Sequence, residues 1–299
     1  MVAATQQMNT QLADSAHPLS ATTWPATLSL QLAKTARGTR LVSTKHNGPL
    51  YVQKPFYPEN AELAHVYLLH PPGGLVSGDQ LAIDLNLSDQ AKALFTTPGA
   101  ARIYRRRTDG LLQEQHVRLS IEHGGFAEWL PMENIVYPKA RGQLTTRVEL
   151  KGDAGFIGWE ISCLGLPASK ALFDEGILKQ SFEIWRDNKP LVIDRFLLDA
   201  NESGVINGQV GLQSYCVNAV MIAGPIADGA LAQELKAKLR ELVMPGEGLA
   251  AITVIGEFLI IRSLAQRAEN VRRYFTDCWQ VIRPELLGRK ACHPRIWLT

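Results

Sequence analysis

Alternation of apolar and polar residues is the feature that most constrains the fold of this chain. In the run DQLAIDLNL, Leu81, Ile83, Leu85 and Leu87 alternate with polar residues, so their side chains share one face of a strand. Comparable runs, such as QHVRLSI, QLTTRVEL and QSFEIW, recur from about residue 26 to about residue 223. Glycine and proline separate them at intervals too short for the helical crossovers of a doubly wound fold. The pattern predicts a mainly β protein and favours largely antiparallel pairing.

A strand-turn-strand unit is repeated three times within this region. Leu87, Ile121 and Leu150 occupy the same place in the three copies and lie 34 and 29 residues apart. Stacked copies predict a helically stacked, two-layer assembly of antiparallel or mixed β-sheets. An ordinary β-meander explains the same spacing, and both interpretations stay open at this point.

Helical periodicity is confined to the C-terminal part of the chain. Apolar residues at helical spacing predict helices over about 226–243, with Asp228 as N-cap, and about 264–283. The first 24 residues show neither helical nor strand periodicity. The expected organisation is therefore a flexible tail over 1–24 and a single β-rich domain over 25–299.

Charge and targeting features exclude several classes of protein. Lys and Arg number 31 against 29 Asp and Glu, and a net charge of +2 gives no strong field for nucleic acid or anionic lipid. The N-terminus lacks the basic and apolar regions of a signal peptide, and no run of 18 apolar residues occurs. The four cysteines form no CxxC pair, which fits a reducing compartment. We expect a cytoplasmic protein that binds neither nucleic acid nor membrane.

The densest candidate for a binding site is the glycine-rich run from His70 to Asp79, HPPGGLVSGD. Glycine-rich loops that hold phosphate open a helix, whereas this one leads into a strand and has no GK[ST] lysine. A structural interpretation is preferred, in which the glycines adopt positive φ and His70 and Asp79 hold the loop backbone by hydrogen bonds.

Motifs of known enzyme classes are missing from the sequence. The seven histidines show no HxH or HExxH spacing, and no serine lies in a GxSxG frame. Four arginines between Arg102 and Arg107 form a basic patch, which suits either an acidic partner or a solvated strand edge. Glu133 and Glu160 lie in WLPMENIVYP and GWEISCLGLPAS, each as one polar residue among strand residues. The residues alone therefore identify no enzyme.

Six motifs together resemble a known family, the urease accessory protein D family (UreD, also called UreH). In chain order they are GPLYVQKPFYPE, LHPPGGLVSGD, TTPGAARIYRR, WLPMENIVY, GWEISCLGLPAS and PRIWLT. The resemblance covers nearly the whole chain. It implies a non-enzymatic chaperone and scaffold of helically stacked β-strands, which works with UreF, the GTPase UreG and apo-urease to insert nickel into urease.

The resemblance also implies that nickel passes through an internal tunnel toward the immature active site. Sparse oxygen and imidazole ligands suit an ion in transit, because each must release it. Asp79, in the HPPGG-x-x-x-GD loop, is the first candidate, and His70, Glu133 and Glu160 are further ones. Nickel is then transient and no cofactor is tightly bound. The alternatives are a small-molecule or phosphate-binding enzyme that uses the HPPGG loop and, behind it, a carbohydrate-binding module.

Overall fold

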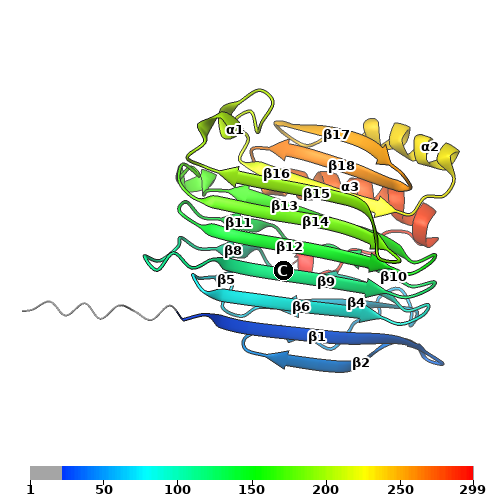
Figure 1. Cartoon of the computed structure of the whole chain (residues 1–299). Helices are drawn as coiled ribbons and strands as arrows, with labels where there is room; N and C mark the ends of the chain where they lie inside the picture. Colours follow the sequence, from blue (N-terminus) through cyan, green and yellow to red (C-terminus); the bar gives the residue numbers. More distant parts are fainter. Residues whose placement is uncertain (1–21, 299) are drawn as a thin grey trace, which may run out of the picture.

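Two β-sheets stacked face to face dominate the computed structural model, which describes residues 22–298 (Figure 1). The first sheet has seven strands in the order β15-β14-β12-β9-β6-β1-β2. Its strands are β1 (Trp24–Thr35), β2 (Gly38–Asn47), β6 (Asp79–Leu87), β9 (Gln113–Ile121), β12 (Arg141–Leu150), β14 (Ile177–Arg186) and β15 (Lys189–Asp199).

The second sheet has eleven strands, with the main order β17-β18-β16-β13-β10-β7-β4-β3 and three short strands beside it. Its strands are β3 (Tyr51–Val52), β4 (Leu63–Leu69), β5 (Gly74–Leu75), β7 (Lys92–Thr96), β8 (Ala101–Ile103), β10 (Phe126–Trp129), β11 (Asn134–Val136), β13 (Gly155–Leu164), β16 (Val217–Gly224), β17 (Gly248–Ile255) and β18 (Phe258–Ala265). The helices are α1 (Ser203–Asn207), α2 (Gly229–Arg240) and α3 (Ala268–Leu287), with 3-10 turns at Pro167–Ser169 and Arg295–Leu298.

The predicted repeat is confirmed as three stacked coils of chain. Leu87 pairs with Ile121 and Ile121 pairs with Leu150, so the equivalent residues form one row across β6, β9 and β12. The following strands, β7, β10 and β13, pair with one another in the second sheet in the same order. The meander interpretation is wrong, because equivalent strands of successive coils are direct neighbours.

The prediction of a mainly β, two-layer stack of mixed sheets is confirmed, but the preference for largely antiparallel pairing is wrong. The pairs β1–β6, β6–β9, β9–β12 and β12–β14 are parallel, as are β4–β7, β7–β10 and β10–β13. Antiparallel pairs are found toward the two ends of the stack, for example β1–β2 and β17–β18. Parallel neighbours need no helical crossover here, because each return connection runs through the opposite sheet.

Apolar side chains fill both faces of the eleven-stranded sheet. Its inner face packs against the seven-stranded sheet, where the four predicted leucine and isoleucine residues of β6 are buried with Leu119 and Phe156. Its outer face is covered by α2 and α3, whose buried residues include Leu235 and Phe275. The helices therefore close a second core on the side away from the seven-stranded sheet.

The predicted helices are present with shifted bounds. Asp228 caps α2 as expected, since its Oδ1 accepts from the backbone N–H of Ala230 at 2.8 Å. The second helix begins at Ala268, because Leu264 is the penultimate residue of β18. Pro284 does not end α3 but lies in its last turn, and Gly288 ends the helix with φ +66°. Among residues 22–298, no helix is both long enough and apolar enough to span a membrane.

The division into a tail over 1–24 and one domain stays a prediction. Residues 1–21 lie outside the described residues, and β1 begins at Trp24.

Leu119 provides a test of the stacked core. It is fully buried between the sheets, and we expect Leu119→Ala to lower the free energy of unfolding by about 2–5 kcal/mol through lost burial and a residual cavity. Leu172→Ala is the control, because Leu172 is 68 % exposed and its truncation should change stability by less than ~0.5 kcal/mol. Denaturant unfolding of both variants is the measurement, and equal midpoints would contradict the packing described.

Candidate functional site

Polar side chains interrupt the apolar core between the two sheets. They lie on the inner faces of β9, β12, β14 and β15 in one sheet and β13, β16 and β18 in the other, as their register with buried core residues shows. We call this set the interior polar belt: Gln115, Thr146, Glu160, Ser162, Gln180, Asp194, Asn218 and Arg262. Inward-facing polar groups cost free energy unless they are hydrogen-bonded, so their partners decide what the belt can do.

Glu160 is the buried centre of the belt. Its carboxylate accepts hydrogen bonds from Thr146 Oγ1 at 2.7 Å, Trp129 Nε1 at 2.9 Å and Asn134 Nδ2 at 3.5 Å. Burial raises the pKa of Glu160, and these three hydrogen bonds oppose that rise by favouring the charged form. A second hydrogen bond also joins the two sheets. Ser162 Oγ on β13 donates to Gln180 Oε1 at 3.0 Å, and Gln180 lies on β14, the strand beside β12. Glu160 is thus a carboxylate held in place by three donors and shielded from solvent.

The belt leads from Glu160 toward the surface at the β15/β18 end of the stack. Glu160, Gln180, Asp194 and Asn218 line an internal cavity of about 10 Å³, roughly the space of one water molecule. Asn218 also lines a surface pocket of about 520 Å³ together with Arg262. Arg262 Nε donates to Asp194 Oδ1 at 3.1 Å across the two sheets. The ion pair offsets the positive charge that Arg262 places beside the pocket.

The HPPGG loop has the geometry of a hydrogen-bonded turn. Asp79 Oδ2 accepts from the backbone N–H of Val76 at 2.8 Å, which is the loop contact expected from the sequence. Gly73 and Gly78 have φ of +71° and +91°, in the region that favours glycine. Val76 and Gly78 both lie between β5 and β6, so the loop leads into a strand as predicted.

His70 and Asp79 are brought close together by this loop. Burial lowers the pKa of His70, and the nearby Asp79 carboxylate acts in the opposite direction. His70 lines a pocket of about 230 Å³ whose wall also includes Gln115 of the belt and Arg102 of the predicted basic patch. The two candidates therefore lie near the β9 side of the belt, although Asp79 also serves the loop backbone.

Glu133 is not part of the belt. It precedes β11. Cys163 belongs to the core on the outer face of the eleven-stranded sheet, and its pKa is raised by a hydrogen bond with Cys216, by burial and, to a smaller extent, by the nearby charge of Glu133. Glu160 points to the inner face of that sheet, so the structure separates these two candidates. Glu133 Oε2 is buried and has no hydrogen-bond partner within the described chain.

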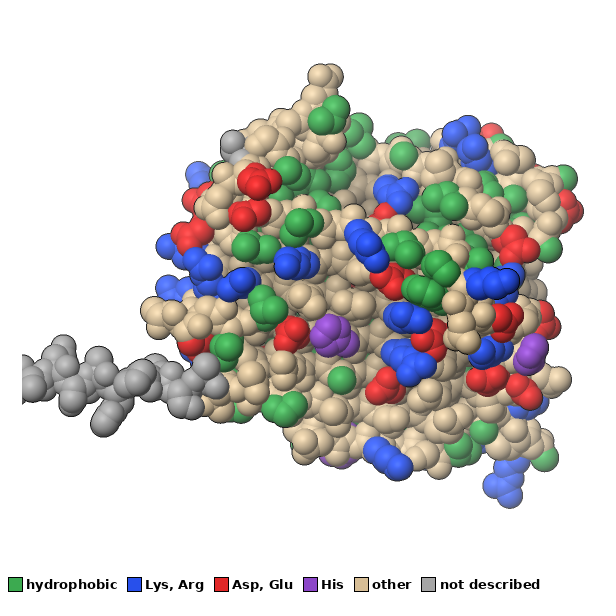
Figure 2. Space-filling model, in the orientation of Figure 1, with side chains coloured by type: hydrophobic (Ala, Val, Ile, Leu, Met, Phe, Trp, Pro, Cys, Tyr) green, Lys and Arg blue, Asp and Glu red, His purple; other side chains and the backbone are tan. Residues whose placement is uncertain are grey.

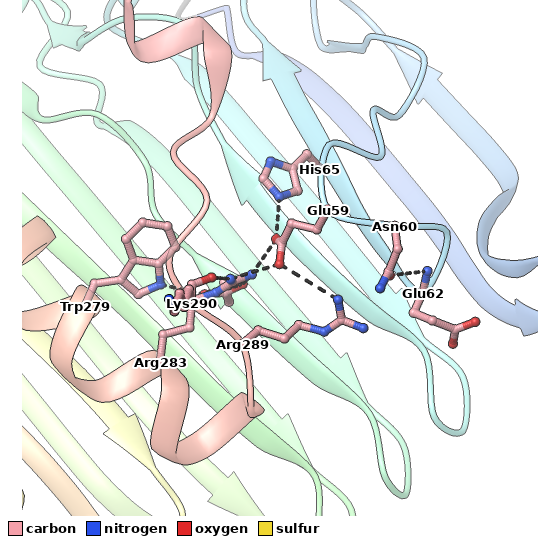
Figure 3. A network of polar contacts seen from close by, with 9 residues as sticks. Glu59, Asn60, Glu62, His65, Trp279, Arg283, Arg289 and Lys290 are labelled. Carbon is pink, nitrogen blue, oxygen red and sulfur yellow. Dashed lines mark hydrogen bonds and ion pairs between the residues drawn. The ribbon is translucent and has the colours of Figure 1, made fainter.

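A buried ionic cluster on the outer face was not anticipated from the sequence (Figure 3). Arg283 of α3 lies between two carboxylates: its Nε donates to Glu128 Oε1 at 2.9 Å, and its Nη2 donates to Glu59 Oε1 at 2.6 Å. Its remaining N–H groups reach Glu59, Glu128 and the carbonyl of Lys290, so all five donors are used. His65 Nε2 lies 3.1 Å from Glu59 Oε1.

The sequence carried a weak signal for this cluster. Glu128 stands inside FAEWLP, where a carboxylate among apolar residues requires a buried partner. That partner lies 155 residues further along the chain, and Glu59 is 224 residues from Arg283, so no local spacing reveals either pair.

The fold and site define a stacked β-scaffold with a polar interior, and comparison with known proteins gives its family. A family model described as UreD urease accessory protein matches residues 25–298. The urease accessory protein UreD of Marinomonas sp. (strain MWYL1) is 43 % identical over 286 residues, covering 94 % of this chain and 92 % of that protein. The UreD of Alcanivorax borkumensis is 42 % identical over 283 residues, covering 92 % of each.

This chain belongs to the UreD urease accessory protein family. That family consists of accessory proteins and not enzymes, so the predicted resemblance and the predicted lack of enzymatic activity are both confirmed.

The ionic cluster generates a pH prediction. Burial raises the pKa of Glu59, but hydrogen bonds from His65 and Arg283 and the charge of Arg283 outweigh it and lower the pKa from 4.5 to about 2. Because the pKa of Glu59 is lower in the folded chain than in the unfolded chain, its ionised carboxylate stabilises the fold above pH 4.5. This contribution to the free energy of unfolding is lost as the pH falls from 4.5 toward 2. We expect Glu59→Gln to be markedly less stable than wild type at pH 6, with the difference shrinking by pH 3.

Denaturant unfolding between pH 6 and pH 3 measures this difference. Glu234→Gln is the control, because Glu234 forms only an exposed pair with Lys238. A stability difference for Glu59→Gln that does not vary with pH would rule out the assigned role of its carboxylate.

Proposed function

We propose that this protein is a urease maturation scaffold that holds apo-urease together with UreF and the GTPase UreG and helps to deliver nickel. In this proposal Ni²⁺ is cargo, no cofactor is tightly bound, and the assembly works in the cytoplasm without nucleic acid or membrane. The family match over residues 25–298 supports the maturation role. The single observation that supports passage of nickel through the interior is the polar belt centred on Glu160.

The chemistry of the belt suits transit better than storage. Its ligands are carboxylate, amide and hydroxyl oxygens, which bind a borderline divalent ion more weakly than thiolate or clustered imidazole would. Glu160 is already engaged by three hydrogen-bond donors, so an incoming ion competes with them for the carboxylate. Weak stations of this kind allow the ion to leave again.

Surface pockets at the two sides of the belt support this path. On one side lies the pocket beside His70 and Gln115, and on the other the pocket beside Asn218 and Arg262. A route between them passes the Glu160 cavity, which shares Asn218 with the second pocket.

Exposed apolar side chains support docking of a protein at the second pocket. Leu197, Val210 and Leu249 line this pocket and are all at least 44 % exposed, and green side chains gather near α1 in Figure 2. Elsewhere on the face shown, charges of both signs are interspersed, so no strong field of one sign arises.

The enzyme alternative at the HPPGG loop receives no support. The loop opens β6 and not a helix, so it presents no helix N-terminus to a phosphate. The carbohydrate-binding alternative likewise has no observation in its favour, and the family is one of accessory proteins.

Glu160→Gln in cells tests the interior route. The host makes urease, UreF and UreG but lacks this chain, and we expect folded urease with little nickel. Wild-type protein should restore the nickel content, whereas Glu160→Gln should restore several-fold less at limiting nickel, because the amide keeps the size but loses the charge. Glu149→Gln, at a surface salt bridge on neighbouring β12, is the matched control and should equal wild type.

Nickel per urease and the yield of complex with UreF are the two readouts. Full nickel loading in the host without this chain would contradict the maturation role. Full loading by Glu160→Gln at normal complex yield would contradict the route past Glu160.

Asp79→Ala separates two roles of the HPPGG loop. A conduit role predicts normal expression and UreF binding with reduced nickel incorporation into urease. A purely structural role predicts a lower yield of folded complex, since loss of the carboxylate leaves the Val76 N–H unpaired at a cost of ~1–3 kcal/mol. Normal yield and normal nickel incorporation together would show that Asp79 fills neither role.

A further inference from the structure

Glu59, His65 and Cys292 bring three different metal-ligating groups together on the outer face of the eleven-stranded sheet. One carboxylate oxygen, one imidazole nitrogen and the thiol sulfur all lie within 4.8 Å of one another. Within residues 22–298 this is the one group of three such side chains with donor atoms this close. The three residues come from the loop before β4, from β4 itself and from the segment after α3, so the fold alone assembles them.

The spacing is close to what a small metal ion requires. Bonds of about 2.0–2.3 Å in tetrahedral geometry place neighbouring donor atoms ~3.3–3.8 Å apart. His65 Nε2 and Glu59 Oε1 are 3.1 Å apart, so these two need almost no movement. Cys292 lies between α3 and the 3-10 turn at Arg295–Leu298, in a segment without helix or strand. A short shift of this backbone, which would bring the thiol closer to the other two donors, therefore disrupts no hydrogen bonds between strands.

Two of the ligands are already oriented by their surroundings. Arg283 holds the Glu59 carboxylate with two N–H groups, which fixes the direction of its oxygens as an outer-sphere partner would in a metal site. His65 is fully buried, and within residues 22–298 the only hydrogen-bond partner of its imidazole is Glu59, because Nδ1 is buried without any. Coordination through Nε2 therefore displaces a single hydrogen bond.

The donor set selects the class of ion. Thiolate and imidazole together with one carboxylate suit Zn²⁺, Ni²⁺ or Co²⁺, whereas Mg²⁺ and Ca²⁺ require oxygen ligands alone. The neighbouring charges also permit a dication: Glu59 and Glu128 carry two negative charges, and Arg283 and Arg289 carry two positive ones. The thiolate formed on binding adds the negative charge that the ion needs.

We propose that Glu59, His65 and Cys292 bind one divalent transition-metal ion of borderline softness, with the fourth coordination position left to water or an exchangeable ligand. On binding, two bonds to hydrogen break: the Cys292 S–H bond, whose proton goes to solvent, and the His65 Nε2–H bond to Glu59, after which the ring keeps a single proton on Nδ1. The freed electron pairs of the sulfur and of Nε2 form the bonds to the metal. Because the thiol gives up its proton to the solvent, binding tightens as the pH rises. This site lies on the opposite face of the sheet from the interior polar belt and does not depend on the proposed nickel route.

Titration of the full chain with Co²⁺ tests the site directly. The chain is produced as a fusion with a cysteine-free carrier, and a thiolate-to-cobalt charge-transfer band should grow in the near ultraviolet and saturate at one equivalent. Cys292→Ser should abolish this band. Cys216→Ser is the matched control, because Cys216 is the other half-buried cysteine, and it should retain the band.

A second measurement uses the unmodified chain and does not rely on any variant folding. Alkylation of the four cysteines by iodoacetamide is followed by mass spectrometry with and without Zn²⁺, and the metal should slow the reaction at Cys292 at least tenfold while leaving Cys216 unchanged. A missing cobalt band in the wild-type chain, a band that survives in Cys292→Ser, or alkylation of Cys292 at the same rate with the metal would each overturn the proposal.

Discussion

The register between successive coils is the constraint on which the rest of this structure depends. Leu87, Ile121 and Leu150 form one row across β6, β9 and β12. Once this row is aligned, every second residue of each strand is paired with an equivalent inward-facing residue of the next strand. A slip of one residue in any strand would turn its apolar side chains to solvent and its polar ones inward. The same register places Thr146 opposite Glu160 across the sheets, so the core and the polar belt are set by one alignment.

The opposite face of the eleven-stranded sheet depends on a different interaction. Arg283 has no exposure to solvent and would cost several kcal/mol of desolvation if it were unpaired. Its five donors are satisfied only when α3, β10, the loop before β4 and the segment after α3 are all in place. Phe275 and its apolar neighbours account for most of the surface that α3 buries against the sheet, whereas the Arg283 guanidinium fixes the position of the helix.

How much of this could be predicted from the sequence varies with the range of the interaction. Period-two alternation located β6, β9 and β12, because it depends on side chains only two positions apart. The recurrence of the same unit at intervals of 34 and 29 residues located their stacking. Parallel pairing was missed because the return of each coil through the opposite sheet leaves no local signal. Leu264 fits a helical stripe and a strand equally well, and its pairing with Asn218 decides for the strand.

The candidate site divides in the same way. The motif containing Glu160 identified a residue that the fold buries among hydrogen-bond donors, and the HPPGG motif identified a turn whose carboxylate holds its own loop. Glu133 is grouped with them by sequence because it also lies in a motif that resembles the family, but it precedes β11, and the next residue, Asn134, is the one that reaches Glu160. The cluster of Glu59, His65 and Arg283 joins residues more than 200 positions apart and is visible only in the folded chain.

The two faces of the eleven-stranded sheet therefore offer different environments to a metal ion. In the proposed interior route, oxygen donors that already accept hydrogen bonds would bind an ion weakly, because each new bond to metal would replace an existing bond to Trp129, Thr146 or Asn134. Outside, the thiol and imidazole are softer donors, and coordination displaces only one hydrogen bond of His65. An ion that must be released suits the first environment, and an ion that must be retained suits the second. Because the sheet separates the faces, neither environment has to serve both purposes.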